Sequence, residues 1–137
     1  MDSNCIFCSI IAGTAPSYLI YQDYTAVAFL DIAPVRQGHT LVVPRSHVPD
    51  LLAEGGAQAL TDSAAAVHHV SRQLRDAFDA DGVSIFQSNG AAAGQEVFHL
   101  HLHVIPRHTG DRLPVRWVRD PEAADTVAAT FALLTGG

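Results

Sequence analysis

The strongest constraint on the fold is the alternation of histidine with apolar residues in "GQEVFHLHLHVIPR", residues 94–107. Side chains of a β-strand point to its two faces in turn, so His99, His101 and His103 are expected on one face. The opposite face is expected to hold the apolar residues Phe98, Leu100, Leu102 and Val104. The pattern predicts a strand over residues 96–106 that stops at Pro106 and packs its apolar face on the core.

The three histidines suit one metal site, ordinary buried positions, or a catalytic group with separate roles. Same-face neighbours on a strand lie about 6.6 Å apart, so two adjacent imidazoles can share one ion but three can hardly do so. The strict period, beside the glycine-bounded loop "NGAAAG", favours a functional row. His68, His69 and His108 lack this pattern, and we interpret them as solvated or partly buried side chains.

Helical spacing of apolar residues predicts three helices. The segment "CIFCSIIAG" predicts a short helix closed by Gly13. A long amphipathic helix is expected over Thr61–Phe78. The apolar residues of its expected buried face are Ala64, Val67, Leu74 and Phe78. A C-terminal helix is expected from Asp120 to Leu134, because Asp120 is a good N-cap residue and a proline follows it.

Runs of β-branched and aromatic residues predict the other strands. These runs are Tyr18–Tyr21, Ala26–Ile32, His39–Pro44 and Gly82–Ser88, and the first two form a hairpin around Gln22–Tyr24. Strands and helices do not alternate as β–α–β units. The predicted fold class is therefore α+β, with a largely antiparallel sheet, one main amphipathic helix and a C-terminal helix in a single domain over residues 1–137.

Charge and hydropathy limit the classes of partner that are expected. The formal net charge is −6 and the 8 positive residues are scattered arginines, so a nucleic-acid polymer is not an expected partner. A small anion is still allowed, because backbone amides or histidines can bind one phosphate. No apolar run approaches the ~18 residues of a membrane span. We therefore expect no membrane partner and a cytoplasmic protein.

Cys5 and Cys8 form a lone Cys-x-x-Cys pair. In a reducing compartment this spacing suits a metal site or a redox pair better than a structural disulfide. By itself the pair does not decide between these readings.

At this point a family resemblance becomes specific. "HLHLHVI", residues 99–105, matches the motif of the histidine triad (HIT) family of nucleotide hydrolases and transferases. The match continues, in family order, through "CIFCSII", "AFLDIAPVRQGHTLVVPRSH" at 28–47, "SN" at 88–89 and "GQ" at 94–95. The sequence therefore resembles a HIT protein over most of its length, and a HIT-like fold is expected.

The resemblance implies a mechanism. His101 would attack the α-phosphorus of a purine nucleoside 5′-phosphate derivative, either a nucleoside phosphoramidate or a dinucleoside polyphosphate. Water would then hydrolyse the covalent nucleotidyl-histidine. His103, Gln95 and Asn89 would bind the phosphate, and His39 would support them. The second ring nitrogen of His101 is expected to donate to a backbone carbonyl, which leaves the attacking nitrogen free.

The resemblance also implies how the nucleotide is recognised. Asp31 would accept hydrogen bonds from the ribose hydroxyls. Phe7, Phe29 and Ile32 would surround the purine base. Without the resemblance, these three apolar residues would be interpreted as plain core.

Bacterial relatives further suggest a structural Zn²⁺, one per chain, held by Cys5, Cys8, His47 and His99. Such a Cys₂His₂ set is closed and leaves no position for water. The resemblance also implies a homodimer.

The sequence departs from the family pattern in two places, and two other functions are considered. Glu96 stands where well-studied relatives often carry a serine or threonine that passes a proton to the leaving group, and the C-terminal tail differs from that of the phosphoramidase branch. One alternative function is a zinc-dependent hydrolase in which the histidines hold a catalytic metal. The other is a nucleotide-binding or scaffold module with weak or no catalysis.

Overall fold

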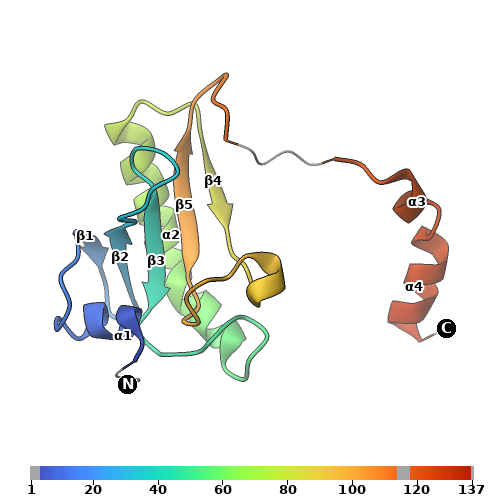
Figure 1. Ribbon diagram of the computed structural model, residues 1–137, viewed down its shortest axis with the longest axis horizontal. Coiled ribbons are helices and arrows are strands. Elements are labelled where there is room, and N and C mark those ends of the chain that lie inside the picture. Colours follow the sequence, from blue (N-terminus) through green and yellow to red (C-terminus); the bar gives the residue numbers. More distant parts are fainter. Residues whose placement is uncertain (1–3, 114–117, 137) are drawn as a thin grey trace.

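Five strands form one antiparallel sheet in the order β1-β2-β3-β5-β4 (Figure 1). The computed structural model describes residues 4–113 and 118–136. The strands are β1 (Leu19–Gln22), β2 (Ala26–Leu30), β3 (Thr40–Pro44), β4 (Gly82–Phe86) and β5 (Leu102–Arg107). The helices are α1 (Ile6–Ile11), α2 (Gly56–Ala77), the 3₁₀ turn η1 (Ala91–Ala93), α3 (Pro121–Ala124) and α4 (Val127–Thr135). The α+β class and the hairpin of β1 and β2 are confirmed.

The two faces of the sheet are covered by different helices (Figure 1). One face packs on α2 through the buried residues Ala26, Ala28, Val42, Val104, Ala66, Val70 and Leu74. The other face packs on α1 through Phe7, Val27, Phe29, Leu41 and Val43. Because Leu41 pairs with His103 in neighbouring strands, His103 lies on the face opposite α2. The functional side chains therefore gather on the α1 side.

Helix α2 differs from its predicted bounds and buried face. It begins at Gly56, five residues before the predicted Thr61. Gly55 precedes it with φ +86°, a conformation that favours glycine, and Gly56 packs so closely on the Leu51 carbonyl that a side chain there would collide with it. The buried positions are Gly56, Ala59, Ser63, Ala66, Val70 and Leu74. The prediction for Ala64 was wrong: Ala64 is exposed. Ser63 takes the buried place because its hydroxyl donates to the Ala59 carbonyl at 2.9 Å and needs no other partner.

The strand predicted over residues 96–106 is shorter at its start. β5 begins at Leu102, and the residues from Gln95 to His101 are not strand. Leu100 is fully buried as expected and packs with Ala59 of α2 and Leu102, whereas Phe98 is 49% exposed. Pro106 does not end the strand: pairing with β3 ends at Val104, so proline's missing donor is tolerated where β4 is the remaining neighbour. The other strands differ from their predicted bounds by one or two residues.

The C-terminal helix predicted from Asp120 to Leu134 is broken into α3 and α4. Asp120 caps α3 as expected, accepting from the amides of Glu122 and Ala123. The break follows because the Thr126 hydroxyl and amide both donate to the Ala123 carbonyl, which replaces the regular helical bond. Both helices stand apart from the sheet and bury none of their residues (Figure 1). None of the helices in the described ranges has the length and apolarity that a membrane crossing needs.

Candidate functional site

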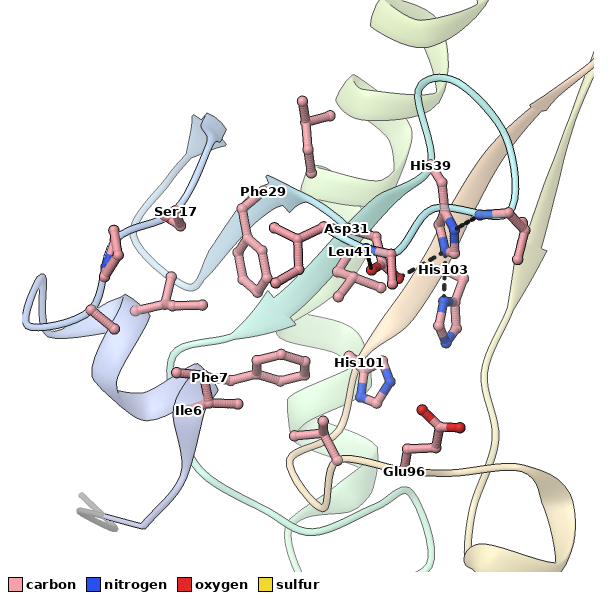
Figure 2. A pocket seen from close by; sticks show the side chains of 18 of the residues that line it. Ile6, Phe7, Ser17, Phe29, Asp31, His39, Leu41, Glu96, His101 and His103 are labelled. Atoms are coloured by element: carbon pink, nitrogen blue, oxygen red, sulfur yellow. Dashed lines mark hydrogen bonds and ion pairs between the residues drawn. The ribbon is translucent and has the colours of Figure 1, made fainter.

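A cavity of about 720 Å³ opens between α1, the ends of β2 and β3, and the loop before β5 (Figure 2). Its apolar end is formed by Ile6, Phe7, Ile10, Phe29, Leu41 and Val97. Its polar end is formed by Asp31, His39, Glu96, His101 and His103. The volume lies within the range of small-molecule sites. The cavity joins an apolar recess to a group of histidines and carboxylates.

His101 is held with one ring nitrogen free. Its Nδ1 lies 2.7 Å from the His99 carbonyl oxygen. A carbonyl only accepts, so Nδ1 carries the proton and Nε2 keeps its lone pair. The edge of the Phe7 ring supports the imidazole at a centroid distance of 5.1 Å. The predicted carbonyl bond is confirmed, and a nucleophilic nitrogen is available in the cavity.

His39 and His103 form a directed pair. The Val35 amide donates to His39 Nδ1 at 3.1 Å, so His39 carries its proton on Nε2. That nitrogen lies 2.9 Å from His103 Nδ1 and donates to it. His103 therefore carries its own proton on Nε2, as a hydrogen-bond donor. His39 lies beside the histidine row, as the resemblance implied, while its supporting role stays a prediction.

Both histidines of this pair are neutral near pH 7. The pKa of His103 is lowered to about 4, mainly by burial and also by the neighbouring His101 and His39, while Asp31 opposes the shift. Burial also lowers the pKa of His39 against the opposing charge of Asp31. This pair thus offers neutral donors rather than imidazolium charges.

The predicted recognition residues also line the cavity. Asp31 is anchored by the Ala33 amide at 2.9 Å from Oδ1, while its Oδ2 lies 3.5 Å from His39 Nε2. The rings of Phe7 and Phe29 are buried and meet edge to face at a centroid distance of 5.4 Å. Ile32 is 86% exposed at the rim. This geometry brings the four residues together, and their contacts with a nucleotide stay predictions.

Gln95 and Asn89 lie outside the lining of this cavity. Gln95 is buried and its amide braces the loop, donating to the carbonyls of Pro49 and Val97 and accepting from the Gly90 amide. The Asn89 carbonyl accepts from the Leu51 amide at 2.7 Å, and its amide donates to Gln87. Their predicted contacts with a phosphate stay predictions.

Sequence reasoning predicted a backbone carbonyl as the partner of His101 but did not identify that carbonyl, nor the backbone groups that orient His39 and His99. The amide of Val35 and the carbonyls of Pro44 and His99 decide which nitrogen of each ring is protonated. Backbone groups are the same in every residue, so no side-chain pattern could have revealed them.

A second cluster brings together the four predicted metal ligands. The donor atoms of Cys5, Cys8, His47 and His99 all lie within 4.8 Å of one another. His99 Nδ1 lies 3.4 Å from Cys5 Sγ and 3.5 Å from Cys8 Sγ, and the two Nδ1 atoms of His47 and His99 are 3.1 Å apart. Donors around a four-coordinate zinc lie about 3.3–3.8 Å apart, so the arrangement fits a metal ion.

The protonation of His99 suits a ligand. Its Nε2 lies 2.8 Å from the Pro44 carbonyl and donates to it, which leaves the Nδ1 lone pair facing the two cysteines. His99 is fully buried, and burial lowers its pKa. This cluster could hold a metal ion.

Asp31, His39 and His103 also have donor atoms within 4.8 Å of one another. Their ring nitrogens, however, already have hydrogen-bond partners. His39 accepts at Nδ1 from the Val35 amide and donates from Nε2 to His103 Nδ1. A metal there would have to displace both hydrogen bonds. The arrangement does not favour a catalytic metal at this position.

Comparison with known proteins places these features in a family. The HIT domain matches residues 12–110. The chain belongs to the histidine triad family. The protein called Hit from Bacillus subtilis is 43% identical over 120 residues, which cover 83% of this chain and 79% of that protein. The family resemblance stated from the motifs is confirmed.

Two further relatives bear on the chemistry of this histidine triad protein. An adenylylsulfatase of Arabidopsis thaliana is 35% identical over 113 residues, covering 82% of this chain and 57% of the relative. A crystal structure described as a zinc-bound histidine triad family protein from Mycobacterium smegmatis superposes with a TM-score of 0.76 at 40% identity, covering 97% of this chain and 96% of that one. The chain is thus similar to a nucleotide hydrolase and to a zinc-bound protein.

Proposed function

We propose that this protein hydrolyses purine nucleoside 5′-phosphate derivatives through a covalent nucleotide on His101. One observation carries the proposal: Nδ1 of His101 donates to the His99 carbonyl, which leaves Nε2 as a free nucleophile in the cavity. The imidazoles of His101 and His103 lie side by side at a centroid distance of 5.0 Å. A phosphate attacked by one ring is therefore within reach of the other.

The histidine pair supplies charge stabilisation. Phosphoryl transfer depends mainly on positioning and on donors aimed at the phosphate oxygens. The Nε2 proton of His103 is such a donor, and the chain of hydrogen bonds from Val35 through His39 holds it in place. The donor is neutral near pH 7, so it binds a phosphate oxygen through a hydrogen bond rather than through a full positive charge.

The apolar recess would hold the base. Phe7 and Phe29 offer aromatic surface at one end of the cavity, and the Asp31 carboxylate lies between Phe29 and the pair of His39 and His103 (Figure 2). A carboxylate only accepts, which suits the two hydroxyls of a ribose. This order of apolar recess, carboxylate and histidines matches the order of base, ribose and phosphate in a nucleotide.

The metal cluster would hold Zn²⁺ as a structural ion. Cys5, Cys8, His47 and His99 would supply four protein ligands, which leaves no open position for water. When bound, the ion would supply a cross-link between α1, the loop after β3 and the segment before β5. Such a link would stabilise the wall of the cavity that carries Phe7 without taking part in the reaction.

The test is a substrate screen with the His101→Ala variant. The lysine amide of AMP, diadenosine tetraphosphate and adenylyl sulfate are offered to both proteins. The wild type should release AMP, and the variant should lose at least about 10³-fold in kcat/KM because the covalent route is removed. AMP binding, measured by calorimetry, should stay within a few fold. A variant that kept wild-type turnover would overturn the proposal.

The same screen tests the two alternatives. A scaffold module would bind AMP and release no product from any compound in the panel. A zinc-dependent hydrolase would lose activity on chelation while the protein was still folded, whereas loss of a structural ion shows first as lost stability.

A further inference from the structure

Glu96 is held at the polar end of the cavity by a braced loop. The buried amide of Gln95 binds Pro49, Val97 and Gly90, which keeps the neighbouring Glu96 in place. Figure 2 shows the Glu96 carboxylate pointing into the space beside His101 and His103. Across residues 4–113 and 118–136, no hydrogen bond or ion pair occupies this carboxylate. It is free to meet whatever binds there.

The carboxylates in the lining of the cavity are not balanced by basic side chains. Its described lining contains two carboxylates, Asp31 and Glu96, and neither lysine nor arginine. His39 and His103 add no positive charge near pH 7, because burial lowers the pKa of each. An anionic group beside Glu96 would therefore meet a like charge with no neighbouring cation to offset it.

The positive side chains nearby lie in a different cavity. Arg36 and Arg112 line a neighbouring cavity of about 740 Å³, which shares Val35, His39 and His103 with the first. Arg36 also forms an ion pair with Asp111, with 3.6 Å between Nη1 and Oδ2. Glu96 belongs to the lining of the first cavity and not to that of the second. Neither arginine is part of the lining to which Glu96 belongs.

We propose that Glu96 determines leaving-group specificity, favouring amines over sulfate and phosphate chains. This inference rests on the proposed function. A carboxylate accepts hydrogen bonds, so it can bind the N–H of a departing amine and attract its positive charge. Sulfate and phosphate oxygens are acceptors and anionic, so they are repelled. Nucleoside phosphoramidates are the expected substrate class.

The bond changes balance with water as the co-reactant. The Nε2 lone pair of His101 forms a bond to phosphorus, and the bond from phosphorus to the leaving nitrogen breaks. The electron pair stays on that nitrogen, which takes a proton from solvent and departs as the amine. In the second step the oxygen of water bonds to phosphorus, the His101–phosphorus bond breaks, and the proton of water returns to solvent. The products are the nucleoside monophosphate and the amine, and Glu96 acts by binding the amine.

The test compares two substrates that share the same AMP group. The kcat/KM values for the lysine amide of AMP and for adenylyl sulfate are measured with the wild type and with Glu96→Gln. The ratio of amide to sulfate should fall about 10-fold in the variant, because glutamine removes the charge and keeps the size. Both values come from one preparation, so partial misfolding cancels in the ratio. Glu122→Gln, on the exposed α3, removes the same charge elsewhere and should leave the ratio unchanged.

Binding to the His101→Ala protein separates this inference from the proposed chemistry. The dissociation constants of the two uncleaved compounds are compared in His101→Ala and in the double variant with Glu96→Gln. A preference for the amide that depends on Glu96 supports the inference even if the wild type releases no AMP. The inference would be overturned if Glu96→Gln weakened the binding of both compounds equally. It would also be overturned if Arg112→Gln, rather than Glu96→Gln, changed the ratio of the two dissociation constants.

Discussion

At the scale of the residue, hydrogen-bond partners decide what each histidine of the motif can do. The Pro44 carbonyl keeps the proton of His99 on Nε2, and the His99 carbonyl keeps that of His101 on Nδ1. His39 donates to Nδ1 of His103, which leaves the His103 proton on Nε2. Three residues of one type therefore present a lone pair to the cysteines, a lone pair to the cavity, and a donor.

The low pKa of His103 predicts a loss of stability in acid. The native pKa is about 4, whereas an unfolded histidine titrates near 6.5, so between these values the unfolded chain binds more protons. The free energy of unfolding should therefore fall as the pH falls from about 6.5 to about 4, by on the order of 1–3 kcal/mol from this residue. Urea denaturation across this range measures the effect.

His103→Asn is the control for this prediction. Asparagine can still accept from His39 but does not titrate, so the stability of the variant should depend less steeply on pH. The contribution of other groups, including the metal ligands, is common to both proteins. Parallel curves for the two proteins would contradict the assignment to His103.

At the scale of the element, α1 depends on its contacts for its structure. It has 6 residues, fewer than an isolated helix needs to be stable in water. Its N-cap is Cys5, whose sulfur accepts from the Cys8 amide at 3.3 Å, and Phe7 packs it on the sheet. This short helix and its N-cap thus carry two of the candidate metal ligands and one wall of the apolar recess.

Metal removal should therefore loosen α1 and weaken nucleotide binding. A chelator should lower Tm by at least about 5 °C and raise KM more than it lowers kcat, because Phe7 moves while His101 keeps its carbonyl bond. Differential scanning fluorimetry and steady-state kinetics measure the two effects. Cys5→Ser, purified without chelator, should behave like the chelated wild type. Loss of kcat at unchanged Tm would instead indicate a catalytic metal.

At the scale of the whole molecule, the C-terminal arm formed by α3 and α4 is an exposed apolar element. α4 contains no charged residue, and Val127, Phe131, Leu133 and Leu134 are each more than half exposed. Such a contiguous apolar surface marks an interaction site, and a helix this short needs packing to persist. We propose that the chain forms a homodimer in which this arm contributes to the interface.

Sedimentation equilibrium should give a mass of twice 14.6 kDa for the full chain. Removal of residues 118–137 should weaken the dimer at least about 10-fold, because the exposed apolar side chains of α4 are lost. The melting temperature of the remaining monomer should change little, since the arm buries none of its described residues in the chain. A full-length monomer, or a truncated dimer of undiminished affinity, would contradict the proposal.

Local periodicity made much of this protein predictable. The alternation of His99, His101 and His103 with apolar residues predicted an extended segment with separate faces, and the family resemblance assembled the metal ligands and the cavity residues around it. Asp120 predicted a helix start correctly, because an N-cap acts within its own first turn. These features depend on residues that are close in the sequence or on a family motif in which each position is fixed.

Tertiary contacts decided the rest. Ser63 replaces Ala64 on the buried face of α2 because the sheet selects which side of the helix is covered, and hydropathy does not encode that choice. Phe98 is exposed and Leu100 is fully buried, because the segment before Leu102 is not paired as a strand and its burial depends on contacts such as that of Leu100 with Ala59 of α2. The protonated nitrogens of His99 and His103 depend on Pro44 and His39, which lie 55 and 64 residues away in the chain. The sequence by itself determined which side chains are available, and only the folded chain determined which atoms they present to one another, because hydrogen-bond partners distant in sequence meet only after folding.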